Sequence, residues 1–428
     1  MSLPVHLPFE FVLFAATLLG VAVLQRRTLE VAIVGLLAVV GYKLAVTGFA
    51  HGPGIAGLLE HLRHEWVVLA NLFGLLMGFA VLSRHFEQSH VPDRLPDYLP
   101  DDWHGGFLLL VMVFVLSSFL DNIAAALIGG TMAASVFRGR VHVGYIAALV
   151  AAANAGGSGS VVGDTTTTMM WIEGVSPRDV LHAYIAAGVA LVVFGIPAAR
   201  QQQAWSPIVR RDTAHVRVDW GRVGVVVWIL GLAIVVNVVS NTRFPAWTDR
   251  LPWLGTAVWI ALLAAAPVRR PDWSVLPAAL RGTIFLLCLV LTASMMPVEH
   301  LPAAAWQTAF GLGFVSAVFD NIPLTKLALV QGGYDWGVLA YAVGFGGSMI
   351  WFGSSAGVAI TNLFPEGRSV VNWLRAGWHV AVAYVVGFAA LLLLNGWHPH
   401  PPHKRANDGA NDRAAEVVNT LTAPATAG

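Results

Sequence analysis

The stretch "SSFLDNIAAAL" at residues 117–127 decides the fold, because it places an aspartate and an asparagine in the middle of a long apolar run. A second stretch, "SAVFDNIPLTK" at residues 316–326, repeats this pattern. Acidic and amide side chains interrupt a simple lipid-facing helix, since they need polar partners within the protein. Both runs are therefore expected to break at these pairs: Asp121 with Asn122, and Asp320 with Asn321.

The apolar runs around the two pairs cover residues 105–138 and 302–332. Each arm of a run has about 15 residues, or roughly 22 Å of helix, whereas the hydrocarbon core of a bilayer is about 30 Å thick. An arm of this length does not cross the membrane. We therefore expect two re-entrant hairpins, each with its Asp-Asn pair at the tip.

The composition of the whole chain is that of a membrane protein. Of its 428 residues, 57% are hydrophobic and only 11% are charged, whereas about 25% of the residues are charged in an ordinary soluble domain. The formal net charge of +1 excludes a strongly basic surface for nucleic acid. Apart from the hairpins, the apolar runs predict about ten transmembrane helices.

A second pair of motifs follows the two hairpins in the same order. These are "GGSGSVVGDTT" at 156–166 and "GGSMIWFGSSA" at 346–356. Such glycine-rich and hydroxyl-rich stretches are too polar for a continuous lipid-facing helix, so the spans 142–173 and 335–364 are predicted to be broken helices that line a cavity. Two motifs that recur in one order indicate an internal duplication.

The predicted fold is an all-α polytopic membrane protein with two inverted repeats, about ten transmembrane helices, two re-entrant hairpins and two broken helices. The first repeat covers residues 1–198 and the second covers 222–395, with a cytoplasmic linker at 199–221. Residues 396–428 are polar and aperiodic, and we expect them to be disordered. Inverted repeats with discontinuous helices are typical of secondary transporters, because two pseudo-symmetric halves can exchange conformations.

The positions of the arginines support this count of crossings. If the hairpins make no net crossing, most arginines between the spans lie on one side, which the positive-inside rule makes cytoplasmic. Both chain termini are then expected on the periplasmic side of a bacterial inner membrane. The cytoplasmic arginines are Arg26, Arg27, Arg138, Arg140, Arg200, Arg210, Arg211, Arg217, Arg269 and Arg270.

The aspartates at the hairpin tips are candidate functional residues, since an ionisable group within the membrane costs several kcal/mol. The alternative is that Asp121 and Asp320 only cap the half-helices that follow them. Capping alone needs no buried charge, because serine or threonine would serve. An acid at the tip offsets the attraction of a helix N-terminus for anions, and the oxygens beside it suit a hard monovalent cation.

Asp164 is the third candidate acid and is followed by four threonines. The alternative interpretation is helix packing through small polar residues. Its counterpart in the second motif is Ser354, so the two half-sites are not equivalent. We predict that Asp121, Asp164 and Asp320 bind Na⁺ or Li⁺ in competition with H⁺. The neutral candidate ligands are Asn122, Asn154, Thr165 and Thr166 in the first half, and Asn321, Ser348, Ser354 and Ser355 in the second.

Lys326 breaks the symmetry between the two hairpins, because its counterpart is Leu127. One interpretation is an internal cation that neutralises one of the three buried acids and takes part in ion binding. The other is a side chain that reaches the outer surface, since the second hairpin opens that way. Glu173 lies near the end of its span and is expected to be interfacial.

These motifs resemble the NhaD-type sodium/proton antiporters, within the ion transporter superfamily that includes arsenite permeases and dicarboxylate or citrate transporters. The resemblance covers residues 105–365, and its most specific part is "GGSGSVVGDTTTTMMWI" at 156–172. It implies a homodimer whose protomers have a scaffold and a mobile transport domain. Lys326 departs from the apolar residue expected after the second Asp-Asn motif. The ion site implied by the resemblance consists of Asp121, Asn122, Asp164, Thr165, Thr166, Asp320, Asn321 and Ser354.

The leading hypothesis is antiport of Na⁺ or Li⁺ against H⁺ by alternating access, without a resident cofactor. The runner-up is an anion permease for carboxylates or arsenite, coupled to Na⁺ or H⁺, in which Lys326 and the half-helix N-termini attract the substrate. An enzyme is not expected, because the sequence shows no pattern of a nucleophile with its base or of a metal cluster.

Overall fold

The computed structural model describes residues 8–24, 27–50, 52–94, 98–208, 217–244 and 250–400, and across these residues the regular structure is helical, without strands. This agrees with the prediction of an all-α membrane protein. Among the predicted cytoplasmic arginines, Arg26, Arg210 and Arg211 lie outside the described residues, as does the predicted disordered tail from residue 401 onward.

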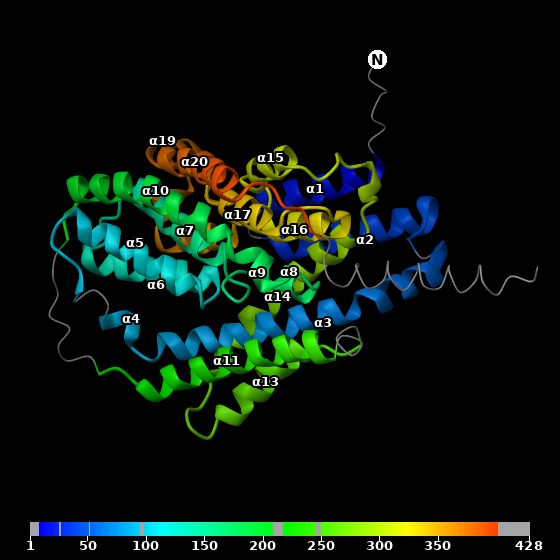
Figure 1. Cartoon of the computed structure of the whole chain (residues 1–428), viewed down its shortest axis with the longest axis horizontal. Coiled ribbons are helices and arrows are strands. Elements are labelled where there is room, and N and C mark those ends of the chain that lie inside the picture. Colours follow the sequence, from blue (N-terminus) through cyan, green and yellow to red (C-terminus); the bar gives the residue numbers. More distant parts are fainter. Residues whose placement is uncertain are drawn as a thin grey trace, which may run out of the picture.

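The described helices are connected in the order given below (Figure 1). In the first part of the chain they are α1 (Phe9–Val23), α2 (Thr28–Tyr42), α3 (Gly54–Glu87), α4 (Val91–Arg94), α5 (Trp103–Ser117), α6 (Asn122–Val136), α7 (Val143–Ser158), α8 (Thr165–Ile172), α9 (Pro177–Leu181) and α10 (Ala183–Trp205). In the second part they are α11 (Trp220–Arg243), α13 (Trp253–Ala265), α14 (Leu276–Ser294), α15 (Trp306–Ser316), α16 (Asn321–Gln331), α17 (Trp336–Gly346), α18 (Ser355–Leu363), α19 (Val370–Ala376) and α20 (Trp378–Asn395).

Within the described residues, 5 helical stretches are long and apolar enough to cross a membrane. Several other helices have 10–17 residues and are apolar. α3 begins at Gly54 and continues through charged residues, one of which is the buried Glu65. α10 continues to Trp205, into the stretch expected to be a linker. The long stretches are Thr28–Thr47, Gly54–Glu87, Pro177–Trp205, Trp273–Ser294 and Trp378–Asn395.

The two halves repeat one local packing arrangement. α5 packs against α7 in the first half and α15 packs against α17 in the second. The Ser117 hydroxyl donates a hydrogen bond to the Ala153 carbonyl, and the Ser316 hydroxyl donates the equivalent bond to the Val343 carbonyl. These bonds join the last turn of the first hairpin arm to the broken helix in both halves.

Glycine makes this close packing possible in both halves. A Cβ added at Gly156 would collide with the Phe114 carbonyl, and one added at Gly346 would collide with the Gly313 carbonyl. The side-chain-free surface allows the backbones to approach, as small residues do between membrane helices generally. The repeated "GG" of the two sequence motifs therefore has the same packing role twice.

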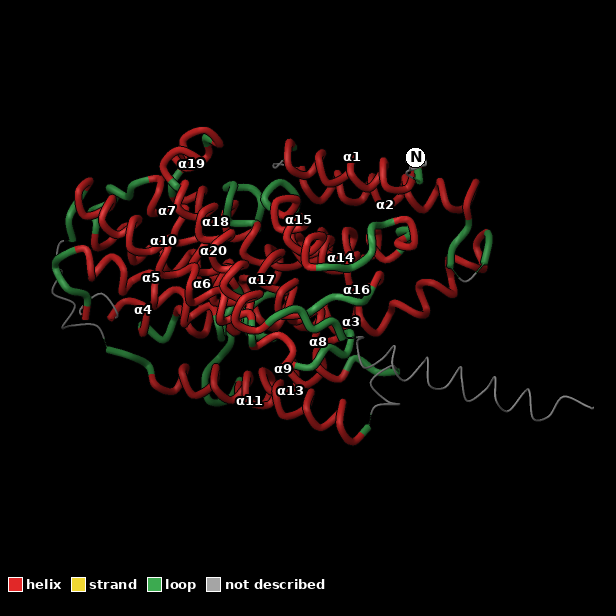
Figure 2. The backbone as a smooth tube through the Cα atoms, turned by 45° about the horizontal axis from the view of Figure 1, so that its top comes forward, coloured by secondary structure: helices red, strands yellow, loops and turns green. Residues whose placement is uncertain are grey.

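The hairpins and broken helices also pack across the two halves. α6 of the first hairpin packs against α18, and α16 of the second hairpin packs against α8. α3 packs with α11 and α13, which lie together in both views of the molecule (Figures 1 and 2). α14 contacts α3 and α16 and so joins this group to the second hairpin.

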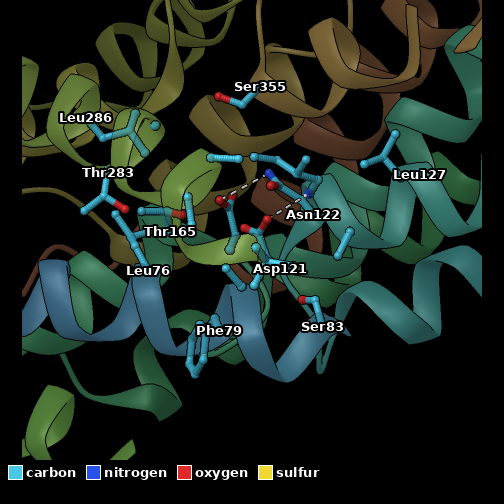
Figure 3. Close-up of a pocket in the computed structure, with 18 of the residues that line it drawn as sticks. Leu76, Phe79, Ser83, Asp121, Asn122, Leu127, Thr165, Thr283, Leu286 and Ser355 are labelled. Carbon is cyan, nitrogen blue, oxygen red and sulfur yellow. Dashed lines mark hydrogen bonds between the residues drawn. The ribbon is translucent and has the colours of Figure 1, made fainter. Parts of the chain in front are cut away.

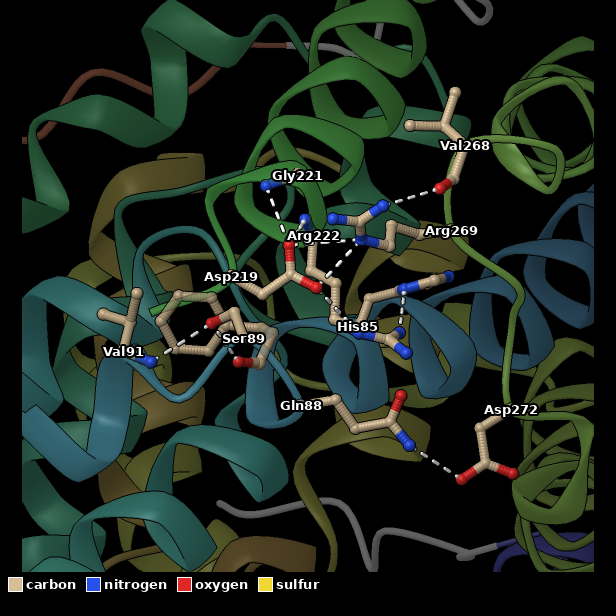
Figure 4. A network of polar contacts seen from close by, with 11 residues as sticks. His85, Gln88, Ser89, Val91, Asp219, Gly221, Arg222, Val268, Arg269 and Asp272 are labelled. Carbon is tan, nitrogen blue, oxygen red and sulfur yellow. Dashed lines mark hydrogen bonds and ion pairs between the residues drawn. The ribbon is translucent and has the colours of Figure 1, made fainter. Parts of the chain in front are cut away.

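Polar contacts gather three connecting segments at one end of the molecule (Figure 4). Arg84 Nε donates to Asp272 Oδ2 over 3.0 Å, and Arg269 Nε donates to Asp219 Oδ2 over 2.8 Å. The Ser274 hydroxyl and the Arg84 guanidinium hold the pKa of Asp272 at about 2. The segments after α3, before α11 and after α13 therefore lie together, as the arginine count requires if they share one side of the membrane.

The segment after α20 contacts the start of α17. The backbone N–H of His398 donates to Asp335 Oδ2 over 2.8 Å, and the indole N–H of Trp336 donates to the His400 carbonyl over 2.6 Å.

Candidate functional site

Four half-helices begin at capped residues, and three of the caps are the predicted acids. Asp121 Oδ2 accepts from the backbone N–H of Ile123 over 3.2 Å at the start of α6, and Asp320 Oδ1 accepts from Ile322 over 3.0 Å at the start of α16. Asp164 caps α8. Helix capping, the alternative interpretation of these acids, is thus part of their role.

Ser354 caps the fourth half-helix, α18, and takes the place that Asp164 has at α8. Its hydroxyl oxygen accepts from the backbone N–H of Gly357 over 3.3 Å. The two broken helices therefore open in the same way, with an acid in the first half and a hydroxyl in the second. This matches the inequality predicted from the motifs.

Asn154 of α7 joins the two halves at the centre of the site. Its Nδ2 donates to Ser348 Oγ over 2.9 Å and to Ser354 Oγ over 3.1 Å. Its Oδ1 accepts from Asn122 Nδ2 over 3.1 Å. Both Asn154 and Ser348 are completely buried. Four of the predicted neutral ligands, Asn122, Asn154, Ser348 and Ser354, therefore form one connected network.

Asp164 lies at the edge of this network with an exposed fraction of 2%. Asn122 Nδ2 lies 3.3 Å from Asp164 Oδ1, and the Thr166 hydroxyl donates to Asp164 Oδ2 over 2.7 Å. A Cβ added at Gly344, the counterpart of Asn154, would lie 3.3 Å from Asp164 Oδ2. The absence of a side chain at Gly344 thus leaves room for the carboxylate between the halves.

Asp320 contacts the second broken helix, where the Ser355 hydroxyl donates to Asp320 Oδ2 over 3.2 Å. The neighbouring Asn321 is 2% exposed, and its Nδ2 is buried without a hydrogen-bond partner among the described residues. An amide group left in this condition costs free energy unless a ligand or water bonds to it. Asn321 is therefore positioned to contact something that enters the site.

A cavity of about 420 Å³ adjoins these residues (Figure 3). Its charged lining residues are all acidic: Asp121, Asp164 and Glu87. The remaining wall comes largely from apolar residues of α3 and α14, such as Leu76 and Leu286. The other predicted site residues on the wall are Asn122, Thr165, Asn321 and Ser355.

The three aspartates do not form a single metal cluster. Among the described residues, no three His, Cys, Asp or Glu side chains come close enough together to hold one metal ion. Asp121 and Asp164 share the cavity wall, whereas Asp320 reaches it through Ser355. A cation in the cavity would therefore meet two carboxylates together with neutral amide and hydroxyl oxygens, which is a suitable set for a hard monovalent ion.

Lys326 does not line this cavity, and of its two interpretations the internal cation fits its burial, whereas a side chain that reaches the outer surface does not. It is 2% exposed, and its Nζ donates to Glu65 Oε2 over 2.8 Å and to Glu173 Oε1 over 2.6 Å. It is absent from the cavity wall, which contains its counterpart Leu127. The lysine thus neutralises acids other than the three predicted ones, because α16 directs it toward α3 and the end of α8.

The sequence interpretation missed several residues and misplaced one. Glu173, expected at the interface, has a side chain only 20% exposed and pairs with Lys326. Glu65 was overlooked, although an acid directly before the apolar run at 66–83 was a usable signal. Ser83, Glu87 and Thr283 line the cavity, but their spacing in the sequence carries no motif that would have identified them.

Comparison with known proteins gives a consistent set of relatives, although no protein-family model matches the chain. It is 27% identical over 388 residues to sodium/proton antiporter 1 of Arabidopsis thaliana, covering 79% of this chain and 64% of that protein. It is 26% identical over 343 residues to the Na⁺/H⁺ antiporter NhaD of Vibrio parahaemolyticus, covering 68% and 79%. The chain is similar in sequence to these sodium/proton antiporters over much of its length. These relatives are named as antiporters and not as enzymes.

A third relative is sodium/proton antiporter 2 of Arabidopsis thaliana, which is 28% identical over 316 residues, with 63% of this chain and 73% of that protein covered. The chain spans slightly less than two thirds of the length of antiporter 1. The resemblance to NhaD-type antiporters stated from the motifs is therefore supported over much of the chain, beyond the motifs themselves.

Proposed function

We propose that this chain is a secondary transporter that exchanges Na⁺ or Li⁺ for H⁺ across a membrane. The observation that carries the proposal is the pair of carboxylates, Asp121 and Asp164, on the wall of one cavity beside a buried network of amide and hydroxyl oxygens. The names of the relatives support the same activity.

The proposed mechanism is competition between a cation and protons for the same carboxylates. Asp164 is buried in surroundings where an unpaired negative charge is costly, so it needs either a bound proton or a bound cation. Asn122, Thr166 and the half-helix N-terminus hold its oxygens in place while this partner changes. Exposure of the loaded site alternately to the two sides of the membrane then couples the two fluxes.

The wider arrangement of the transporter is part of the proposal. The two halves are inverted repeats, and the protein functions as a homodimer with a scaffold and a mobile transport domain in each protomer. The termini lie in the periplasm of a bacterial inner membrane, so the end that contains Arg84 and Arg269 faces the cytoplasm. The cavity wall reaches Glu87, near that end, and the site would therefore face inward in this conformation.

An anion permease is the less favoured alternative. Anion binding would require a cationic group beside the half-helix N-termini, but the charged residues on the cavity wall are all acidic. Lys326 is already paired with two carboxylates. The site therefore repels a carboxylate substrate more than it attracts one.

Proteoliposomes that contain a pH-sensitive dye test the proposed exchange. Addition of NaCl or LiCl outside acid-loaded vesicles should alkalinise the interior, whereas choline chloride at the same ionic strength should not. The Asp164→Asn variant, which keeps the size of the side chain and removes its charge, should lose the response. A wild-type protein that shows no response to Na⁺ or Li⁺ over pH 6 to 9 would contradict the proposal.

A further inference from the structure

The buried ion triad of Lys326, Glu65 and Glu173 lies outside the cavity but is built on the same helices as the site. Lys326 lies six residues after Asp320 on α16, roughly 9 Å along the helix axis. Glu173 directly follows α8 as its C-cap. It lies nine residues after Asp164, or roughly 13 Å along the helix axis. The triad thus connects the far parts of two half-helices that begin at the candidate ion site.

α3 contains Glu65 of the triad and also part of the cavity wall, at different positions along the helix. Glu65 is in the first half of the helix, whereas Leu76, Phe79 and Ser83 line the cavity further along. Glu65 precedes Leu76 by eleven residues, or roughly 16 Å. The triad is therefore separated along α3 from the residues that line the cavity. Its carboxylates form a second acidic centre.

The two glutamates of the triad require a cation between them. Glu65 is 7% exposed and Glu173 approaches the same Nζ from another helix, so the ionised pair would place two negative charges close together in a poorly solvated region. Such a pair must take up a proton or a cation. In this chain the ammonium group of Lys326 meets that need with two short charge-assisted hydrogen bonds.

We infer that Lys326 is a resident counter-cation that keeps Glu65 and Glu173 from binding the transported ion, and thereby limits cation binding to the Asp121 and Asp164 site. The inference deepens the proposed function and rests on it. A tethered ammonium cannot leave with the substrate, so Lys326 places a fixed positive charge between Glu65 and Glu173. Lys326 is on this account a residue that determines how many cations bind.

The contrast with the first hairpin supports this assignment. The counterpart of Lys326 is Leu127, which lies on the cavity wall and has no charge. The lysine instead lies where α16 packs against α8 and where its Nζ reaches Glu65 of α3. A snorkelling role would leave the ammonium in contact with water, but its side chain is only 3% exposed.

Thermal unfolding of the purified full-length chain in NaCl and in choline chloride tests the inference. The variant Asp164→Asn removes the principal site and should show no Na⁺-specific rise in Tm. Adding Lys326→Met to it removes the ammonium group between Glu65 and Glu173 and should restore a Na⁺-specific rise in Tm. A further Glu65→Gln substitution should abolish that rise, and Lys326→Arg in place of Lys326→Met should not produce it.

The result that overturns the inference is the absence of a Na⁺-specific shift in Asp164→Asn with Lys326→Met, or a shift that survives Glu65→Gln. The Lys326→Met variants could unfold in choline chloride. In that case NaCl should restore the fold, because Na⁺ replaces the missing ammonium group. A variant that folds in neither salt overturns the inference. A persistent Na⁺ shift in Asp164→Asn alone would instead count against the proposed ion site, so the two failures are distinguishable.

Discussion

The two halves of the site share a local plan but present different chemistry to the cavity. In the first half, Asp121 and Asp164 both line the wall. In the second half, the wall contains Asn321 and Ser355, and Ser354 occupies the position equivalent to Asp164. The repeated motifs determine the helix breaks and the close packing in both halves. Single differences within the motifs, such as Asp164 against Ser354, concentrate the negative charge in the first half.

The largest expected effect is the difference between Asp164→Asn and Ser354→Ala. Asp164→Asn removes the buried charge that binds the cation, so Na⁺-driven exchange in proteoliposomes should fall to background. Ser354→Ala removes only a cap and one acceptor of the Asn154 amide, and exchange should remain measurable. Equal losses of exchange activity in the two variants would show that the two halves are functionally equivalent, contrary to this expectation.

The next effect concerns Asn154, which bonds to both halves. Asn154→Ala leaves Asn122 and Ser348 without their partner in a buried region, at a cost of about 1–3 kcal/mol for each unsatisfied group. We expect a clear decrease in Tm, measured by thermal unfolding in detergent. The control is Asn362→Ala, at an exposed position at the end of α18, which should change Tm little. A Tm for Asn154→Ala equal to that of the control would refute the joining role.

A smaller effect separates the two hydroxyls that donate to the acids. Thr166 donates to the fully buried Asp164 over 2.7 Å, whereas Ser355 donates to the half-buried Asp320 over 3.2 Å. Hydrogen bonds to charged groups contribute about 1.5–3 kcal/mol when buried and less when water competes. Thr166→Ala should therefore weaken the apparent Na⁺ affinity of exchange more than Ser355→Ala does. The opposite order would show that Asp320 is the more important acid.

The smallest expected effect is that of Gly344→Ala. The added Cβ would lie 3.3 Å from Asp164 Oδ2, so the carboxylate must shift by a few tenths of an ångström. We expect a loss of about 1 kcal/mol in stability, as for mild overpacking, together with weaker Na⁺ binding. Gly188→Ala, on α10 with no atom within 4 Å of the added Cβ, is the matched control and should be neutral or slightly stabilising. Full Na⁺ affinity in Gly344→Ala would show that the space left by Gly344 is not needed for Na⁺ binding at Asp164.

The helical class and the four breaks could be predicted from the sequence, because their causes are local. An Asp-Asn pair in an apolar run, and glycines beside hydroxyls, make a continuous lipid-facing helix unfavourable whatever surrounds them. The residues at the breaks, from Asp121 to Ser355, could be selected for the same reason. Their mutual hydrogen bonds follow from the repetition of one plan in two halves that pack together.

Other features depend on contacts between distant segments and left no local pattern. Lys326 looked like either a snorkelling or a substrate-binding residue, because its partners Glu65 and Glu173 lie far away in the sequence. The cavity wall formed by α3 and α14 was equally unpredictable, since Ser83 and Thr283 are ordinary residues of apolar helices. The contacts of His398 and His400 with the start of α17 likewise join segments that are distant in the sequence.

The central claim is that Na⁺ and H⁺ compete for the same carboxylates. Measuring the protons released when Na⁺ binds is its decisive test. Purified protein in weakly buffered detergent solution, mixed with NaCl, should acidify the medium in proportion to the protein present, and Asp164→Asn should release no protons above the choline chloride control. Saturable binding of Na⁺ to the wild-type chain without any accompanying proton release, at every pH from 6 to 9, would contradict the account.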